Sequence, residues 1–259
     1  DRALFGCLLP GKDGPSCLAV AENLKQTLLQ FGAQTVSTGI AVYPSLDYTK
    51  DQILENAAKA LEHAAFFGAD SRVTFDAISL NISGDAKYDA GDIHGAIEEF
   101  RRAVMLDGRI ANLHNSLGGC YGIVNDLESA LREFETAIEL DPAESLAWFN
   151  AGLSNLLLKD RQKALEYFSK AAETDPHFFE AVLQAGKLHL DGNEALEAKP
   201  YLEKAVDLRR ESGPAFSCLG ECYAALGSTE DAQSAYKKAL RLNANDAVAL
   251  SGLGWLYIE

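Results

Sequence analysis

The chain has 259 residues, of which 47% are hydrophobic and 24% charged, and its formal net charge is −15. This composition supports a buried core and excludes a chain that is disordered throughout. No apolar run approaches the roughly 18 residues that a membrane-spanning helix needs, and the excess of acids repels the phosphate backbone of nucleic acids. We therefore expect neither a nucleic acid nor a membrane as a partner of this chain.

The cysteines and histidines indicate neither a disulfide framework nor a metal site. The chain has five cysteines, an odd number, and none of them stand in C-x-x-C spacing. The five histidines are scattered, and no H-E-x-x-H, G-x-S-x-G or phosphate-binding glycine loop occurs. Buried free thiols are typical of a reducing compartment. We expect a cytoplasmic protein without cofactor, metal or catalytic residues, and therefore no enzyme.

Residues 1–76 predict the order strand, helix, strand, helix, strand. An apolar run at residues 4–9 is typical of a buried strand and ends before Pro10. Helical spacing follows in SCLAVAENLKQTLLQFG, and a β-branched strand pattern follows in QTVSTGIAVYP. The second helix is predicted in TKDQILENAAKALEHAAFFG, with Thr49 and Gln52 as a capping pair, and the last strand in SRVTFDA. These elements predict an α/β or α+β segment with about three strands.

From residue 77 onward the sequence repeats with a period of 34 residues. Glycine recurs at this period as Gly84, Gly118, Gly152, Gly186, Gly220 and Gly254. Alanine recurs in two further series, and between them lies a large apolar residue in each unit, at Phe100, Phe134, Phe168, Leu202 and Tyr236. Small residues let two antiparallel helices cross closely, and the large residue fills the space between units. Stacked units then bury one continuous core.

This pattern resembles the tetratricopeptide repeat (TPR), in which W-x-x-L-G-x-x-Y leads to A-x-x-x-F and then P. The segments that carry the resemblance are WFNAGLSNLLLKDRQKALEYFSKAAETDP and LGGCYGIVNDLESALREFETAIELDP. It implies a right-handed superhelical solenoid of helix pairs. We expect units at residues 77–110, 111–144, 145–178, 179–212 and 213–246, and a partial unit at residues 247–259. Such arrays usually end in a polar capping helix, so we expect the native protein to be longer.

Residues 1–76 resemble the C-terminal portion of the GGDEF domain, the diguanylate cyclase module of bacterial signalling. The resembling segments are FGCLLPG, TVSTGIAVYP and AAKALEHAAFFGADSRVTFD. The chain as a whole would then be α+β and mostly α, with a partial GGDEF-like domain at residues 1–76 and a TPR array at residues 77–259. On this alignment the opening stretch is the middle of a domain whose first half precedes Asp1.

The same alignment implies that this domain is inactive. The signature Gly-Gly-Asp/Glu-Glu-Phe falls on Asp1, Arg2, Ala3, Leu4 and Phe5, and Phe5 alone matches. Ala3 and Leu4 have no carboxylate to offer to a hard cation. The family's phosphate-contacting Lys falls on Ala65, and its following Asn falls on Asp70.

Two functional hypotheses follow. The first is a protein–protein interaction scaffold in bacterial signalling, attached to a catalytically inactive GGDEF-like domain. The alternative is a diguanylate cyclase, or a regulator that responds to a nucleotide or cyclic dinucleotide, which uses the repeats as a sensor and is active in a longer parent chain. A half sheet with an unpaired edge also leaves a homodimer possible.

The TPR resemblance places a peptide or protein ligand in a concave groove lined by the first helix of each unit. We project eight side chains into it: Asn115, Phe149, Asn150, Leu153, Leu157, Leu183, Gln184 and Lys187. The amides of Asn150 and Gln184 both donate and accept hydrogen bonds, so they can bind the backbone of an extended ligand. Apolar members would form the floor of the groove. The alternative for the apolar members is packing between repeats.

Overall fold

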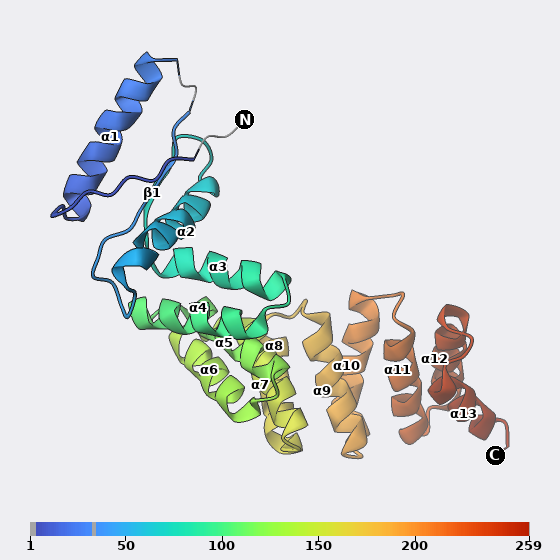
Figure 1. Ribbon diagram of the computed structural model, residues 1–259. Helices are drawn as coiled ribbons and strands as arrows, with labels where there is room; N and C mark the ends of the chain where they lie inside the picture. Colours follow the sequence, from blue (N-terminus) through green and yellow to red (C-terminus); the bar gives the residue numbers. More distant parts are fainter. Residues whose placement is uncertain (1–3, 33–34, 259) are drawn as a thin grey trace. The chain divides into compact units, whose positions relative to one another are not determined.

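The structure, a computed structural model, describes residues 4–32 and 35–258. Two compact units divide the chain, with Asn125 as the last residue of the first unit and Asp126 as the first residue of the second. Thirteen α-helices and two short strands make up the regular structure of the described residues (Figure 1).

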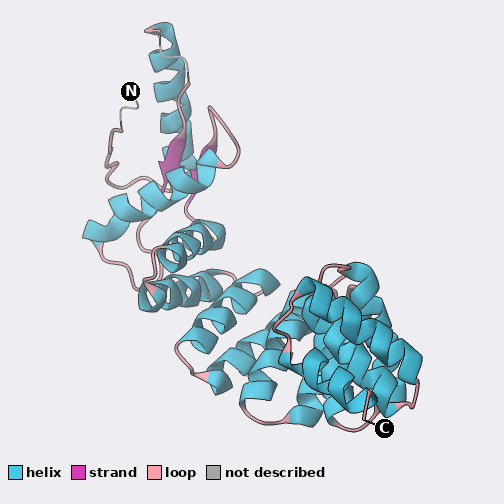
Figure 2. Ribbon diagram, turned by 90° about the vertical axis from the view of Figure 1, so that its right-hand side faces the viewer, coloured by secondary structure: helices cyan, strands magenta, loops and turns pink. Residues whose placement is uncertain are grey.

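The N-terminal part of the first unit is built around a two-stranded parallel sheet (Figure 2). Its elements are α1 (Gly14–Gln30), β1 (Thr38–Ile40), a 3-10 turn (Lys50–Gln52), α2 (Ile53–Ala65) and β2 (Arg72–Thr74). Gly39 pairs with Val73. A Cβ at Gly39 would lie 2.1 Å from the carbonyl oxygen of Ala57, so only glycine lets α2 pack this closely on β1. The predicted capping pair forms, since Gln52 Oε1 accepts from Thr49 N at 2.9 Å.

The structure corrects the predicted strands of this segment. The apolar run at residues 4–9 forms no strand, and Leu4 and Phe5 are 75% and 88% exposed. The two strands that do form have three residues each, so the expected three-stranded segment is wrong. An apolar run becomes a strand only where another strand pairs with it, and β1 and β2 pair with each other alone. Asp1 to Ala3, on which most of the GGDEF signature would fall, lie outside the described residues.

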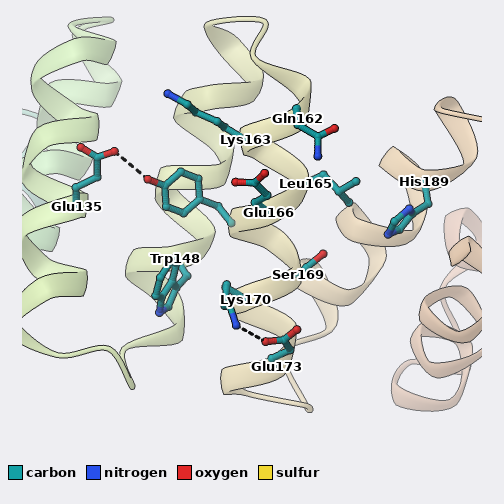
Figure 3. Close-up of a pocket in the computed structure, with 11 residues that line it drawn as sticks. Glu135, Trp148, Gln162, Lys163, Leu165, Glu166, Ser169, Lys170, Glu173 and His189 are labelled. Atoms are coloured by element: carbon teal, nitrogen blue, oxygen red, sulfur yellow. Dashed lines mark hydrogen bonds and ion pairs between the residues drawn. The ribbon is translucent and has the colours of Figure 1, made fainter.

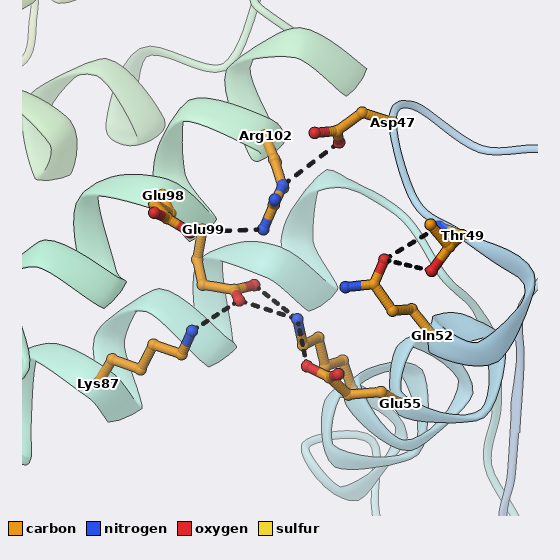
Figure 4. A network of polar contacts seen from close by, with 9 residues as sticks. Asp47, Thr49, Gln52, Glu55, Lys87, Glu98, Glu99 and Arg102 are labelled. Atoms are coloured by element: carbon orange, nitrogen blue, oxygen red, sulfur yellow. Dashed lines mark hydrogen bonds and ion pairs between the residues drawn. The ribbon is translucent and has the colours of Figure 1, made fainter.

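Three repeat helices complete the first unit: α3 (Ala77–Asp89), α4 (Ile93–Leu106) and α5 (Ala111–Ile123). A buried ionic network ties α2 to them (Figure 4). Both carboxylate oxygens of Glu99 on α4 accept from Lys59 of α2 at 2.9 Å, and one accepts from Lys87 of α3 at 2.9 Å. Glu99 is 1% exposed. Burial acts to raise the pKa of Glu99, but the hydrogen bonds and charges of Lys87 and Lys59 outweigh it and lower this pKa.

The second unit consists of helices that pack one after another in chain order. They are α6 (Leu127–Leu140), α7 (Ser145–Leu157), α8 (Arg161–Thr174), α9 (Phe179–Asp191), α10 (Ala195–Leu208), α11 (Gly213–Ala225), α12 (Thr229–Leu242) and α13 (Ala247–Leu256). These helices fall within the predicted 34-residue units. The boundary predicted between residues 76 and 77 stays a prediction.

The repeating residues explain the geometry of each helix pair. A Cβ at Gly152 would lie 2.7 Å from Cε1 of Phe168, so glycine lets the phenylalanine ring pack directly on the backbone of α7. Between the two helices of a pair, the chain turns through a left-handed residue that recurs every 34 residues, at Gly91, Asn125, Lys159, Asn193 and Gly227. Asp160 then caps α8, because its carboxylate accepts from Lys163 N at 3.1 Å.

None of the described helices is both long enough and apolar enough to cross a lipid bilayer.

Candidate functional site

The predicted groove residues lie on three first helices of the repeats. Four are on α7 and three on α9, all within the second unit, whereas Asn115 is on α5 in the first unit and is buried. The helix pairs thus bring seven of the eight residues onto two helices that each pack against α8. Their role in binding stays a prediction, but their burial divides them into two sets.

The first set packs inside the repeat array. The Phe149 ring lies 5.4 Å from that of Phe168 and 4.9 Å from that of Phe178, centroid to centroid. Leu183 belongs to the same core and is buried, while Leu153 is half-buried against the neighbouring cluster around Phe168. These three side chains contribute to the packing between one repeat and the next.

The second set reaches the surface. Leu157 at the end of α7 is 64% exposed, and Asn150, Gln184 and Lys187 are half-buried. Leu146, one turn before Asn150 on α7, is also exposed. Apolar and amide groups therefore stand on the same helix, an arrangement that suits an extended peptide with one apolar anchor.

Charged groups continue this surface towards α11 and α13. Burial raises the pKa of Glu221, and the nearby charge of Asp246 raises it further. Asp246 in turn accepts a hydrogen bond from the Ser217 hydroxyl at 2.7 Å. Burial also raises the pKa of the Cys218 thiol to about 11, against the opposing charge of Lys187. Cys218 is therefore a protonated thiol at neutral pH and a weak nucleophile.

Within residues 4–32 and 35–258, no three His, Cys, Asp or Glu side chains are grouped as a metal ion would require.

A separate hollow of about 720 Å³ lies over α8 in the second unit (Figure 3). Its lining residues come from α6, α7, α8 and α9. Tyr167 crosses it and donates to Glu135 at 2.8 Å, with its ring 5.7 Å from that of Trp148. Burial raises the pKa of Tyr167, and its hydrogen bond to Glu135 raises it further. The side chains that line this hollow therefore already contact one another.

A second hollow of about 470 Å³ lies between α11 and α12. Phe216, Leu219 and Tyr223 of α11 form its apolar wall, and Lys238 and Arg241 of α12 stand on the opposite side. None of the predicted groove residues lines either of these two hollows.

Comparison with known proteins decides the nature of the helical region. A family model described as tetratricopeptide repeat matches residues 124–177 and 183–247. Residues 124–177 and 183–247 are tetratricopeptide repeats. The TPR prediction is thereby confirmed, whereas the comparisons give no support for a GGDEF-like domain in residues 1–76. No curated protein matches the chain.

Solved structures, two of which are described as TPR proteins, show the same fold. The crystal structure of MamA protein is 22% identical, covers 66% of this chain and 93% of its own, and gives a TM-score of 0.59. YrrB, described as a TPR protein with an unusual peptide-binding site, is 22% identical, with coverages of 68% and 91% and a TM-score of 0.60. A TPR protein from Parabacteroides merdae ATCC 43184 is 18% identical, with coverages of 70% and 72% and a TM-score of 0.59. At these identities the likeness shows the fold alone.

The search for site residues in the sequence missed both hollows, because it considered the first helix of each TPR unit alone. Both hollows depend on the second helices, α8 and α12. A signal was present: Lys238 and Arg241 are bases three residues apart, and so on one helical face, in a strongly acidic chain.

Proposed function

We propose that this chain is a protein-interaction scaffold that binds a peptide or protein segment on the first-helix surface of its TPR units and has no catalytic activity of its own. The observation that carries the proposal is the surface of α7 and α9, where exposed Leu146 and Leu157 flank the half-buried amide of Asn150. A peptide backbone needs such donors and acceptors, and an apolar side chain of the peptide would cover the leucines.

The rigidity of the helix pairs also supports this role. Side chains on helices held by a close-packed core keep their positions, so binding costs little ordering entropy. Peptide binding is stated for YrrB in its description, and we extend to this chain only the general mode of binding.

The proposal does not include nucleotide cyclisation or a signalling role. In the GGDEF alignment, Leu4 stands at a carboxylate position and is exposed coil. Ala65 has no phosphate-binding ammonium, and the Asp70 carboxylate accepts from Val36 N at 2.8 Å and pairs with Lys25. We therefore carry the scaffold hypothesis forward by itself.

Selection of peptides on the purified chain tests the proposal. A random peptide library displayed on phage is panned against the protein, and binding of each selected peptide is measured by fluorescence polarisation. We expect Leu157→Asp to weaken binding at least about tenfold, because it removes an apolar contact and introduces an unpaired carboxylate. The matched control is Leu196→Asp on α10, where Leu196 is similarly exposed but lies on a second helix.

The proposal fails if panning enriches no peptide above background. It also fails if Leu157→Asp and Leu196→Asp change the affinity of the selected peptides equally. Circular dichroism of both variants confirms that the helices are intact before either result is interpreted.

A further inference from the structure

We propose that the groove between α11 and α12 is a second docking site, distinct from the first-helix surface, which binds an acidic peptide segment of a partner protein. The groove is the 470 Å³ hollow described above. Its occupant would place an apolar side chain against Phe216 and Tyr223 and its carboxylates beside Lys238 and Arg241.

The two sides of the groove differ in chemistry. On the α11 side, Leu219 is buried and Phe216 and Tyr223 are half-buried, so an apolar surface faces the opening. On the α12 side, Lys238 and Arg241 are exposed. The Lys238 ammonium lies 5.9 Å from the centre of the Phe216 ring, which joins the positive edge to the apolar wall.

Lys238 and Arg241 of this groove are not neutralised by ion pairs within the described part of the chain, although Asp231 lines the same groove. Across the residues that the structure describes, no acidic side chain forms an ion pair with Lys238 or Arg241. Several other bases of the second unit are paired, as Lys170 is with Glu173 at 2.7 Å and Arg209 with Glu180 at 2.7 Å. Two unpaired bases at one edge of a chain with net charge −15 are a local attraction for carboxylates.

The repeat provides an internal comparison, because positions 68 residues apart belong to equivalent places in two TPR units. Lys170 and Glu173 of α8 are equivalent to Lys238 and Arg241 of α12. The residue equivalent to Arg241 is acidic in three successive earlier units, at Glu139, Glu173 and Asp207. In the α8 unit this acid pairs with the lysine, whereas in the α12 unit the charge is reversed and the lysine is left available.

A second substitution falls in the same groove. Tyr167, which lines the hollow over α8, and Tyr201 are both equivalent to Ala235, which lines the α11–α12 groove. The smaller alanine leaves Phe216 and Tyr223 as the aromatic side chains that line this groove. The change in charge and the change in size thus fall in one unit and act on one groove.

Helix stability does not account for the bases. A base in the last turn of a helix interacts favourably with the helix dipole, yet the other second helices α4, α6, α8 and α10 have none there. These helices form with acids or neutral residues at that end. The bases on α12 are therefore available for an interaction outside the fold.

The two ends of the groove also differ in charge. Asp231 lies at the N-terminal end of α12, and Glu203 of α10 accepts from the Tyr223 hydroxyl at 2.8 Å, so this end is acidic. Carboxylates of the occupant are repelled here and attracted at the Lys238–Arg241 end. Nucleic acid would bring a continuous line of phosphates past both ends and past an acidic surface, so the geometry favours a short acidic segment around one apolar residue.

The test uses a fluorescein-labelled peptide with glutamates on both sides of a single leucine. Binding is measured by fluorescence polarisation at low and at physiological salt. Three matched peptides replace the glutamates by lysines, the glutamates by glutamines, or the leucine by serine. We expect the acidic leucine peptide to bind best and its affinity to fall as salt rises.

Two variants locate the site. K238E/R241E reverses the positive edge and should weaken binding at least about tenfold, while Ala235→Tyr restores the side chain of the α8 unit and should fill the groove. Lys170→Glu is the control for charge, because it reverses the base of α8 at the position equivalent to Lys238. Circular dichroism and thermal unfolding confirm that each variant is folded.

Several outcomes would overturn the proposal. Equal binding of the glutamate and lysine peptides would do so, and so would equal effects of K238E/R241E and Lys170→Glu. The groove would be a simple anion site if inorganic phosphate displaced the acidic peptide and the leucine and serine peptides bound with equal affinity. Sedimentation that shows a dimer abolished by K238E/R241E would assign the groove to a second copy of this chain.

Discussion

Replacement of Gly152 by alanine tests the packing principle of the whole repeat array. The added Cβ would lie 2.7 Å from Cε1, 2.8 Å from Cδ1 and 3.2 Å from Cγ of Phe168, although carbon atoms in contact prefer about 3.5–4.0 Å. The ring must therefore move by roughly 1 Å against a core in which Phe168 is completely buried. Overpacking of this kind costs about 1–3 kcal/mol, and the higher helix propensity of alanine returns about 0.5–1 kcal/mol.

The net expectation is a loss of about 1–2 kcal/mol in the free energy of unfolding of the second unit. For a protein of this size, this corresponds to a fall of about 2–8 °C in the unfolding midpoint. Urea and thermal unfolding followed by circular dichroism measure both quantities. The matched control is Gly254→Ala, at the equivalent position of α13, where a Cβ meets no described atom within 4 Å.

Gly254→Ala should leave stability unchanged or raise it by at most about 1 kcal/mol. In the double variant G152A/F168L the smaller side chain should recover part of the loss, which makes the two changes non-additive. If Gly152→Ala is as stable as the unaltered protein, the close approach of ring and helix does not constrain this position and the reasoning is refuted.

Three further predictions concern the first unit. Glu99→Gln removes the buried counter-charge of Lys59 and leaves it the exposed Glu55 carboxylate at 3.2 Å, which should cost at most about 3–5 kcal/mol at neutral pH. The pKa of Glu99 is lowered from 4.5 in the folded state, so the stabilisation by its carboxylate is present above that pH and is lost as the pH falls below it. Urea unfolding should therefore show that the difference in the free energy of unfolding between E99Q and the unaltered protein narrows as pH falls below about 4.5. Burial raises the pKa of the Cys120 thiol to about 11, so mass spectrometry after alkylation at about pH 8 should find exposed Cys7 modified and Cys120 intact; modification of both in the native protein would contradict this. Gly39→Ala should displace α2 from β1, and limited proteolysis should then cut before residue 77 while the repeats persist.

The repeat helices could be predicted from the sequence because each unit has small and large residues at the same positions. The unit expected at residues 145–178 contains α7 and α8, which end at Leu157 and Thr174. The glycine and the aromatic residue of that unit, Gly152 and Phe168, contact each other as their spacing predicts. The units of one chain can be compared with one another as homologous sequences would be, and the residues that recur in all of them mark the packing positions.

The N-terminal segment could not be predicted in this way because its contacts are non-local. An apolar run such as residues 4–9 has the same composition whether or not another strand pairs with it. The Lys59–Glu99 pair joins side chains 40 residues apart, and no periodicity in either helix marks it. Only the fold brings these two charges together.

The candidate site could be predicted less well than the repeat helices but better than the N-terminal segment. The period shows which helix a residue belongs to, but α7 is packed on more than one side, so spacing alone did not separate buried Leu183 or half-buried Phe149 from exposed Leu157. Asn150 and Gln184 are half-buried and retain access to solvent, and their role in binding stays a prediction.

Departures from the repeat indicate function more directly than the repeat itself. Every TPR unit must satisfy the same packing requirements. If one residue type packs well at a position in several units, packing alone does not explain a different residue type at the equivalent position of another unit. Glu173 and Tyr167 satisfy those requirements in the α8 unit by pairing with Lys170 and Glu135. Their replacement by Arg241 and Ala235 removes both internal partnerships at once. A partner can supply the carboxylate and the apolar side chain that are missing from these positions. We therefore place the second docking site in the α11–α12 unit and not in its neighbours.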